Sequence, residues 1–262
     1  MAKKVLIIGG AGFIGSYITR ELLDQNIETI LLDAYVQYFS PEQVDGNLHL
    51  RYHQERMKDV VGKVDILRGD TRDKDHMRRV ILHHRPTHII LLAALPLANI
   101  SNTFSEEAVS TILSSAVNVL EIIRDVDFVE RFVYASSSMI YGDFQYVPAD
   151  EKHPTYPKNV YGGAKLAGEV MTRTYHQAYG MEYVIVRPSA VYGPTDVNRR
   201  VVQIFVENAL MGKPLVLRGA DETKLDFTYI KDIAHGFVLA TLHPDAANET
   251  FNITCGNGRS LR

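Results

Sequence analysis

The chain has 262 residues, of which 46% are hydrophobic and 23% charged, and its formal net charge is −3. This apolar fraction excludes an intrinsically disordered chain, and an isoelectric point near 6.4 argues against a nucleic-acid-binding protein. The longest apolar run, Ile89 to Ala98, reaches about half the length of a membrane span, so we expect no membrane contact. Since Cys255 is the single cysteine, no internal disulfide is possible, which favours a reducing, cytoplasmic location.

Short, nearly continuous apolar runs alternate with amphipathic stretches along most of the chain. The runs predict strands buried on both faces of a sheet, at Lys4–Ile8, Glu28–Leu32, Val64–Leu67, His88–Leu92, Arg131–Tyr134 and Tyr183–Val186. The stretches between them have the apolar spacing of helices, at Ile14–Asp24, Asp73–His84, Glu106–Asp125 and Val160–Ala178. This alternation predicts an α/β fold, a doubly wound parallel sheet with helices on both faces.

The pattern changes after Arg187, where glycines and prolines interrupt the chain. Helices are expected at Arg199–Met211 and Asp232–Leu242, and a last strand at Phe251–Thr254. We therefore expect a nucleotide-binding domain over residues 1–187, with 226–254 packing back on it. Residues 188–225 and 255–262 would form a small C-terminal substrate lobe.

A glycine-rich segment, Gly9-Gly10-Ala11-Gly12-Phe13-Ile14-Gly15, follows the first predicted strand and opens the first helix. Glycines here permit a tight turn and the close approach of a pyrophosphate to the helix N-terminus. Asp33 follows about 20 residues later, at the end of the second strand, where a carboxylate binds adenosine ribose hydroxyls and repels a 2′-phosphate. The joint spacing indicates a Rossmann site for NAD rather than NADP, and a mere glycine-rich turn with a surface aspartate does not explain it.

Weaker signals follow the third and fourth predicted strands. Asp70 could accept a hydrogen bond from the adenine amino group, although spacing alone favours the alternative that Asp70 or Thr71 caps the next helix. Ala93 and Ala94 are small residues at the carboxyl edge of the sheet, where a cofactor could pass.

Tyr161 and Lys165 stand four residues apart at the start of a predicted helix. This spacing places the phenol and the ammonium on one helix face, and a nearby cation lowers a tyrosine pKa so that the phenolate can act as a base. Three serines, Ser136 to Ser138, follow the fifth predicted strand at the same edge of the sheet. A surface Tyr/Lys pair and a serine-rich loop are each common, but together, behind a glycine fingerprint, they indicate a catalytic site.

With these motifs, the sequence resembles the extended short-chain dehydrogenase/reductases of the NAD-dependent epimerase/dehydratase family, which act on nucleotide sugars. Besides the segments above, the resemblance rests on Leu92-Ala93-Ala94, Phe132 to Gly142, Arg187 to Pro194 and Asp226 to Asp232. In this family the catalytic hydroxyl lies four residues before the tyrosine of a Tyr-Gly pair. Tyr141-Gly142 therefore points to Ser137.

The resemblance implies a role for each matched position. Tyr161 is expected to be the general base, Lys165 to tune it and bind the nicotinamide ribose, and Ser137 to hold the reacting hydroxyl. The expected cofactor-binding residues are Gly9, Gly12, Phe13, Ile14, Gly15, Asp33, Asp70, Thr71, Ala93, Ala94, Tyr161, Lys165 and Pro188. The expected substrate-binding residues are Ser137, Ser138, Lys224, Arg218 and Arg199, and no metal site is expected.

The substrate side departs from the family pattern. Ile112, Ala190 and Leu225 stand where members often have Asn, Asn and Arg that contact the sugar nucleotide. An Arg-to-diphosphate bond is charge-assisted and strong, so we expect another cation to face the cleft. The cations available for this are Lys224, Arg199, Arg200 and Arg218. Family members also continue beyond the length of this sequence, so we expect the substrate lobe to be incomplete.

The resemblance implies NAD-dependent epimerisation of a nucleotide-linked sugar through a transient keto intermediate. Met139 stands where family dehydratases carry an acidic residue, which argues against 4,6-dehydration. Two alternatives stay open: a dehydrogenase, reductase or decarboxylase with the same residues, and a non-catalytic NAD-binding regulatory protein. The family also suggests a homodimer formed through the helices that hold Asn118–Arg124 and Tyr161–Val170.

Overall fold

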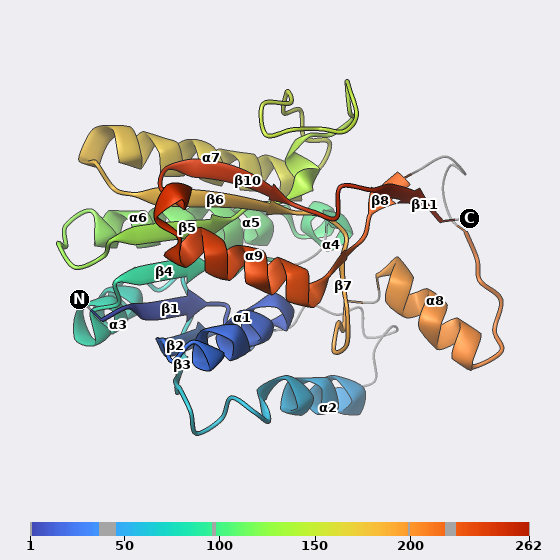
Figure 1. Cartoon of the computed structure of the whole chain (residues 1–262), viewed down its shortest axis with the longest axis horizontal. Helices are drawn as coiled ribbons and strands as arrows, with labels where there is room; N and C mark the ends of the chain where they lie inside the picture. Colours follow the sequence, from blue (N-terminus) through green and yellow to red (C-terminus); the bar gives the residue numbers. More distant parts are fainter. Residues whose placement is uncertain (1, 37–45, 96–97, 199, 218–223, 262) are drawn as a thin grey trace.

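The computed structural model describes residues 2–36, 46–95, 98–198, 200–217 and 224–261. The main strands in these ranges are β1 (Lys4–Ile8), β2 (Glu28–Asp33), β3 (Asp65–Arg68), β4 (His88–Leu91), β5 (Arg131–Ala135), β6 (Tyr183–Pro188) and β10 (Glu249–Ile253). They form one parallel sheet in the order β10-β6-β5-β4-β1-β2-β3 (Figure 1). The strands β1 to β6 were expected from their apolar runs, and β10 overlaps the last strand expected at Phe251–Thr254. The predicted doubly wound parallel sheet is confirmed.

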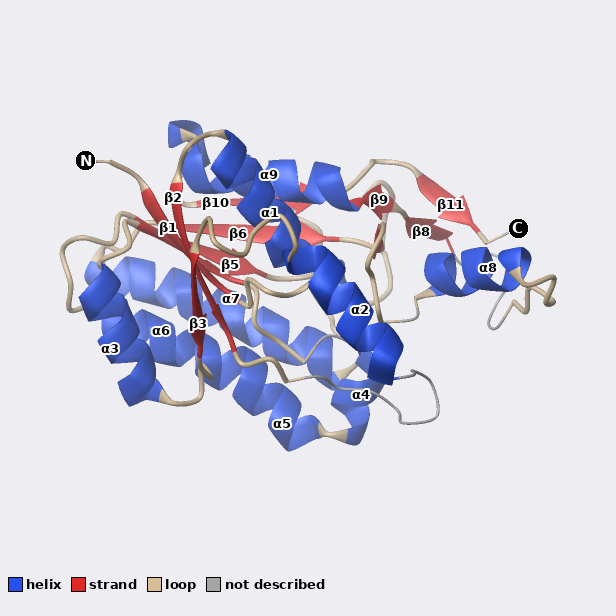
Figure 2. Ribbon diagram, turned by 90° about the horizontal axis from the view of Figure 1, so that it is seen from below, coloured by secondary structure: helices blue, strands red, loops and turns tan. Residues whose placement is uncertain are grey.

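Helices cover both faces of this sheet, as Figure 2 shows. One face carries α1 (Phe13–Asp24), α9 (Ile230–Leu242) and α2 (Gly46–Met57). The other face carries α3 (Lys74–His84), α6 (Ser115–Ile123) and α7 (Val160–Tyr179). Before α6, the chain forms α4 (Ala98–Thr103), α5 (Ser105–Val109) and a π-helical turn at Ser110–Ser114.

Successive residues of each central strand point to opposite faces and build two apolar cores. On β1, Val5 and Ile7 belong to the core under α1 and α9, whereas Leu6 and Ile8 belong to the core under α3 and α6. Burial on both faces is what a continuous apolar run predicts. That prediction is wrong for β3, whose residues are half-buried or exposed because this strand forms the edge of the sheet.

Several elements lie outside the predicted pattern. β7 (Val191–Tyr192) pairs with β9 (Thr228–Tyr229), and β8 (Lys224–Asp226) pairs with β11 (Gly258–Ser260). These strands are too short for an alternating pattern to reveal them, and α2 has too few apolar residues for a helical one. The expected helix near residue 200 is present as α8 (Val201–Leu210), which lies away from the sheet beside β8 and β11 (Figure 2). In the described ranges, no helix is both long and apolar enough to cross a membrane.

The strand order places a crevice at one edge of the sheet. From β1, the strands β2 and β3 extend to one side, and β4, β5, β6 and β10 extend to the other. The connections therefore reverse direction between β1 and β4. In open α/β sheets, ligands bind outside the carboxyl ends of the strands at such a reversal.

Candidate active site

A cleft opens at the carboxyl ends of the central strands, where the strand order reverses. Every residue expected at the cofactor lines this one cleft; they are Gly9, Gly12, Phe13, Ile14, Gly15, Asp33, Asp70, Thr71, Ala93, Ala94, Tyr161, Lys165 and Pro188. They come from several separate segments of the chain. The parallel sheet brings them together because its strands all end at the same edge.

The glycine-rich loop forms the floor of the cleft between β1 and α1. Gly9 has φ of +86°, and a Cβ there would stand 2.8 Å from the backbone nitrogen of Ala93. A Cβ on Gly15 would stand 2.7 Å from the carbonyl oxygen of Gly10. Only glycine fits at either position, and the tight turn lets α1 begin at Phe13 with its N-terminus at the cleft. That end of a helix attracts anions such as a pyrophosphate.

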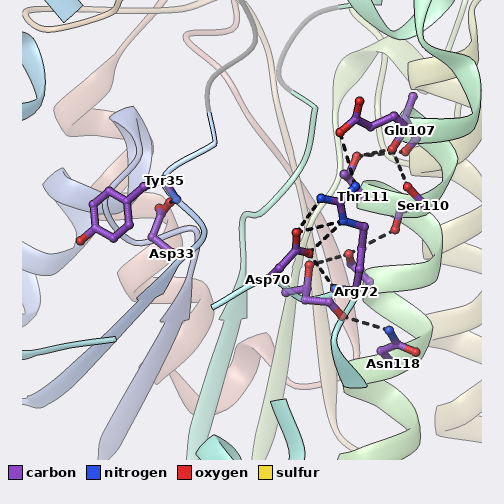
Figure 3. Close-up of polar contacts among 11 residues, drawn as sticks. Asp33, Tyr35, Asp70, Arg72, Glu107, Ser110, Thr111 and Asn118 are labelled. Carbon is purple, nitrogen blue, oxygen red and sulfur yellow. Dashed lines mark hydrogen bonds and ion pairs between the residues drawn. The ribbon is translucent and has the colours of Figure 1, made fainter. Parts of the chain in front are cut away.

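Asp33 ends β2 beside this loop, where Figure 3 shows it next to Tyr35. Its Oδ2 accepts a hydrogen bond from the backbone nitrogen of Ala11 at 3.0 Å, and its Oδ1 accepts one from that of Tyr35 at 2.8 Å. Burial raises the pKa of Asp33 above its ordinary value, and these two hydrogen bonds oppose the rise. The backbone donors hold the carboxylate in one orientation, and each oxygen keeps lone pairs for a further donor.

Asp70 lies across the cleft and is engaged by Arg72, as Figure 3 shows. Nη2 of Arg72 donates to Oδ2 of Asp70 at 2.6 Å, and Nε donates to both carboxylate oxygens at 3.0 Å. The Arg72 guanidinium therefore lowers the pKa of Asp70. Arg72 also pairs with Glu107 of α5. The carboxylate expected to meet adenine is thus held ionised by a neighbour that sequence reasoning did not consider.

Neither Asp70 nor Thr71 caps α3, so the capping alternative is wrong. The cap is Asp73, whose Oδ1 accepts a hydrogen bond from the backbone nitrogen of His76 at 2.9 Å. Thr71 is instead anchored to α6 by a hydrogen bond between its Oγ1 and Oγ of Ser115, at 2.5 Å. Nδ2 of Asn118 donates to the carbonyl oxygen of Thr71 at 3.0 Å.

Ser137 and Tyr161 meet at the nicotinamide end expected for the cleft. Ser137 follows β5 and opens a 3-10 turn over Ser138–Ile140, with its Oγ accepting a hydrogen bond from the backbone nitrogen of Met139 at 3.2 Å. The side chain of Ser137 lies close enough to the Tyr161 hydroxyl to lower the pKa of the phenol. This proximity is compatible with the choice of Ser137 from the Tyr141-Gly142 pair, which stays a prediction.

Tyr161 is the second residue of α7, and Lys165 follows one turn later on the same face. Asn159 fixes the start of this helix, since its Oδ1 accepts a hydrogen bond from the backbone nitrogen of Gly162 at 2.8 Å. Burial raises the pKa of Tyr161, whereas the charge of Arg200 and the nearby hydroxyl of Ser137 lower it. Nζ of Lys165 stands 5.8 Å from the centroid of the Tyr161 ring.

Lys165 is buried more deeply than the sequence indicates. It is 3% exposed, and its Nζ donates to the carbonyl oxygen of Ala135 at 2.5 Å. Burial lowers the pKa of Lys165 to about 7, and the nearby carboxylate of Glu169 opposes this. The lysine is thus close to losing the charge that a phenolate base needs beside it.

Comparison with known proteins identifies the family. The model of the NAD-dependent epimerase/dehydratase family matches residues 5–254. The chain belongs to this family.

Three relatives illustrate the likeness. A putative UDP-glucose 4-epimerase of Methanocaldococcus jannaschii is 29% identical over 98% of this chain and 78% of its own length. UDP-glucuronate 4-epimerase 1 of Arabidopsis thaliana is 30% identical over 89% of this chain but 53% of its own length, so the chain spans about half of that protein. The crystal structure of a Thermus thermophilus UDP-glucose 4-epimerase with NAD has a TM-score of 0.81 and 30% identity, over 98% of this chain and 79% of that one.

The cleft fits the family's cofactor. A Cβ at Gly9 would meet the neighbouring backbone, so the loop leaves room for a pyrophosphate only as glycine. Asp33 presents an oriented carboxylate at the end of β2, where a ribose is bound in this fold. As a member of the family the chain is an enzyme with NAD as its cofactor, and it acts on a small-molecule substrate.

The cleft is also lined by two residues of α2 near Asp33 that were not predicted from the sequence, His53 and Arg56. Arg56 is 5% exposed, and its Nε donates to the carbonyl oxygen of Thr195 at 3.0 Å. Burial lowers the pKa of Arg56 to about 10, while the charges of Asp196 and Asp33 oppose this. No motif signals these residues, because α2 was itself not predicted.

On the substrate side, Arg200 is the available cation that lines the cleft in the described ranges. Its Nη1 lies 2.9 Å from Oδ2 of Asp196, a carboxylate whose side chain is 3% exposed. Lys224 is exposed on β8 and does not line the cleft, and Ser138 is half-buried beside Ser137. The other two expected substrate residues, Arg199 and Arg218, lie outside the described residues.

Three positions depart from the family pattern, and none of their side chains lines the cleft; they are Ile112, Ala190 and Leu225. Ile112 is 1% exposed in the core, and Thr111 just before it lines the cleft. The side chain of Ile112 itself therefore does not line the cleft. Ala190 has φ of +29° after β6, and Leu225 is half-buried in β8. Neither lines the cleft.

Asp33→Ser is expected to relax the preference for NAD over NADP. The unaltered carboxylate repels a 2′-phosphate, so we expect NAD to bind at least about tenfold more tightly than NADP. Without it, the charge of Arg56 near the end of β2 is no longer opposed by a carboxylate, and the two affinities should approach each other. Calorimetric titration with both cofactors measures this. NADP binding as tight as NAD binding in the unaltered protein would contradict the assignment of Asp33.

Proposed function

We propose that this protein catalyses NAD-dependent epimerisation of a nucleotide-linked sugar through a transient keto intermediate. The observation that carries the proposal is the meeting of Tyr161 and Lys165 in one cleft with the glycine-rich loop and Asp33, with the side chain of Ser137 next to Tyr161. The relatives named as UDP-sugar 4-epimerases support a uridine diphosphate sugar and inversion at its C4 carbon.

Tyr161 is the general base of the proposed reaction. Its phenolate removes the proton from the sugar hydroxyl, and Ser137, which lies close to Tyr161, aligns that hydroxyl between the two side chains. A charged Lys165 on the same helix face stabilises the phenolate. After the keto sugar has turned in the site, Tyr161 returns the proton to the oxygen atom of the inverted centre.

The chemistry that NAD⁺ supplies when bound is reversible hydride acceptance at the nicotinamide, so the sugar is oxidised and reduced again without net redox change. The residues of this chain that hold it are the glycine-rich loop, Asp33 and Lys165. Met139 stands exposed beside Ser137, and its thioether can neither donate nor accept a proton. This supports epimerisation rather than dehydration.

The test is turnover of UDP-glucose, UDP-galactose, UDP-glucuronate and UDP-N-acetylglucosamine in the presence of NAD, with the epimers separated by chromatography. We expect one pair to interconvert without accumulation of NADH. Stoichiometric NADH would instead indicate a dehydrogenase or decarboxylase. Tight NAD binding with no turnover of any of the four would indicate a non-catalytic NAD-binding protein.

Arg200→Ala is expected to weaken sugar-nucleotide binding while leaving NAD binding unchanged. Arg200 lines the cleft and its charge acts on Tyr161, so its guanidinium is placed to meet the substrate diphosphate. Loss of a charge-assisted hydrogen bond costs about 2 kcal/mol, or roughly 30-fold in affinity. Calorimetric titration of the NAD complex with a UDP-sugar measures the change.

Lys224→Ala is the matched control, because Lys224 is an exposed cation of the same lobe outside the cleft. It should bind the UDP-sugar like the unaltered protein. If Arg200→Ala also binds normally, the substrate is not held by a diphosphate contact at Arg200, and the dehydrogenase alternative gains support.

The proposal includes a substrate lobe over 188–225 and 255–262, a cytoplasmic location and a homodimer. The placement of α8 beside β8 and β11, away from the sheet, supports the lobe. The exposed, unpaired thiol of Cys255 is compatible with a reducing compartment. The helices α6 and α7 lie together on one face of the sheet, as the dimer requires.

A further inference from the structure

A buried ion pair joins α7, which carries Tyr161 and Lys165, to β6. Glu169 of α7 has no exposed surface, and Arg187 of β6 is 3% exposed. Nε of Arg187 donates to Oε1 of Glu169 at 2.8 Å, and Nη2 donates to Oε2 at 2.7 Å. The pair is therefore bidentate, the strongest form of such a contact. Arg173 adds a third donor, at 3.0 Å from Oε2.

Arg187 uses its remaining nitrogen to hold the turn that carries Ser137. Nη1 of Arg187 donates to the hydroxyl of Tyr141 at 2.8 Å and to the carbonyl oxygen of Glu151 at 3.0 Å. Tyr141 follows the 3-10 turn directly and lies four residues after Ser137. Its hydroxyl donates in turn to Oδ1 of Asn252 in β10, at 2.7 Å. One guanidinium thus connects the helix of the base with the turn of the serine.

Glu169 also acts on the charge of Lys165. The two residues lie four positions apart on α7, so their side chains are neighbours. The ionisable groups that face Lys165 are Tyr134 of β5, with its ring centroid 5.3 Å from Nζ, and Tyr161 and Glu169 of α7. Glu169 is the carboxylate among them, and Arg187 lowers its pKa and keeps it ionised.

We propose that Glu169 is a positioning residue for catalysis, which keeps the Lys165 ammonium charged and, through Arg187, fixes α7 against the turn of Ser137. This inference rests on the proposed function. This role explains why Glu169 and Arg187 form a buried ion pair here, although a pair of apolar residues of the same size commonly makes a protein equally or more stable. An apolar pair would fill the space but would leave the buried Lys165 without a counter-charge.

Glu169→Gln tests the proposal, since glutamine keeps the shape and one acceptor for Arg187 but removes the charge. Lys165 then loses its proton more readily. We expect the alkaline limb of the kcat/KM profile to move by about one unit to lower pH, with about a tenfold loss at alkaline pH that shrinks as the pH falls. A wild-type pH profile in this variant would overturn the proposal, whatever its melting temperature.

Glu182→Gln is the matched control. Glu182 pairs with the buried Arg131 at the start of β5, the opposite end of the strand from Ser137. Both variants remove a carboxylate partner from a buried arginine, so both should lower the melting temperature. Only Glu169→Gln should move the pH profile. An equal shift in Glu182→Gln would mean that loss of stability causes it, and would overturn the proposal.

A second measurement needs no sugar substrate. The ionisation of Tyr161 in the NAD complex is followed by ultraviolet difference absorption against Tyr161→Phe. We expect Glu169→Gln to raise the pKa of the Tyr161 phenol, because its neighbouring lysine is less often charged. An unchanged titration overturns the proposal, whereas absence of turnover with every UDP-sugar affects only the proposed function. If Glu169→Gln does not fold, Glu169→Gln/Arg187→Gln avoids leaving a buried Arg187 without its carboxylate partner and allows the same comparison.

Discussion

Tyr161→Phe is expected to reduce turnover by about 10²–10⁴-fold, the usual contribution of a positioned acid–base group. The substitution removes the hydroxyl that lies close to Ser137 and keeps the ring at the start of α7. Because Asp33 and the glycine-rich loop are untouched, NAD should bind as in the unaltered protein. The measurements are steady-state turnover of the accepted UDP-sugar and calorimetric titration with NAD.

Tyr156→Phe provides the control for this substitution. Tyr156 is 82% exposed, and the same loss of a hydroxyl there should leave turnover within about twofold, as for most surface substitutions. Near-normal turnover by Tyr161→Phe would move the general base to another residue. A parallel loss of NAD affinity would show that the phenol acts in cofactor binding, and the drop in rate could not then be assigned to proton transfer.

Buried parallel strands are the part of this fold that sequence predicts best. A strand such as β1 must be apolar on both faces, and this gives a continuous run that surface strands lack. The edge strand β3 shows the limit, because an apolar run with one neighbouring strand is buried less than the run implies. α2 shows another limit, since it packs on α1 with few apolar residues and has no helical pattern.

The residues of the site also fall into those that the sequence predicts and those that it does not. Residues held by backbone geometry, such as Gly9, Gly15 and Asp33, have a local signature, because a turn or a strand end dictates both residue type and spacing. Residues held by contacts across the fold have none. Arg200 reaches the cleft from the segment before α8, and the charge of Arg56 reaches Asp33 from a helix that spacing does not predict. Such neighbours are set by tertiary packing alone.

The electrostatics of Lys165, the lysine of the proposed active site, also could not be predicted from the sequence. The Tyr161–Lys165 spacing indicates a cation beside a phenol, but not that the cation is buried. With Nζ surrounded by two aromatic rings and one carboxylate, the Lys165 ammonium is costly to hold in the folded chain. Sequence alone gives no sign of this cost, because it is the tertiary packing that buries Lys165 and places Glu169 and Tyr134 near it.

Lys165→Met is therefore expected to remove most activity and yet stabilise the ligand-free fold. The pKa of Lys165 is lowered to about 7 from 10.5, and a shift of this size corresponds to roughly 5 kcal/mol. Methionine fills the space without charge but leaves the carbonyl oxygen of Ala135 without its donor, which costs about 1 kcal/mol. The net gain in the free energy of unfolding should be roughly 4 kcal/mol, with turnover reduced by about 10²-fold or more.

The sign of the pKa shift fixes how this gain depends on pH. Below about pH 7, Lys165 is charged in both the folded and the unfolded chain, so the full cost of burying the charge is present and the advantage of Lys165→Met is largest. Between about pH 7 and 10.5 the folded chain gives up the proton while the unfolded chain retains it. In this range the folded chain holds a neutral Lys165, so the free-energy cost of folding is that of removing the proton rather than that of burying the charge. Because the proton is easier to remove at higher pH, the unaltered protein gains stability and the advantage shrinks.

Urea unfolding at about pH 6 and about pH 9 measures the difference, with NAD left out because we propose that it binds at Lys165. Lys152→Met, at an exposed lysine, should change stability little at either pH. A Lys165→Met variant that is less stable than the unaltered protein at the lower pH would contradict the buried charge. Equal gains at both pH values would show that methionine stabilises through packing instead, because only the removal of a titrating group makes the gain fall as the pH rises.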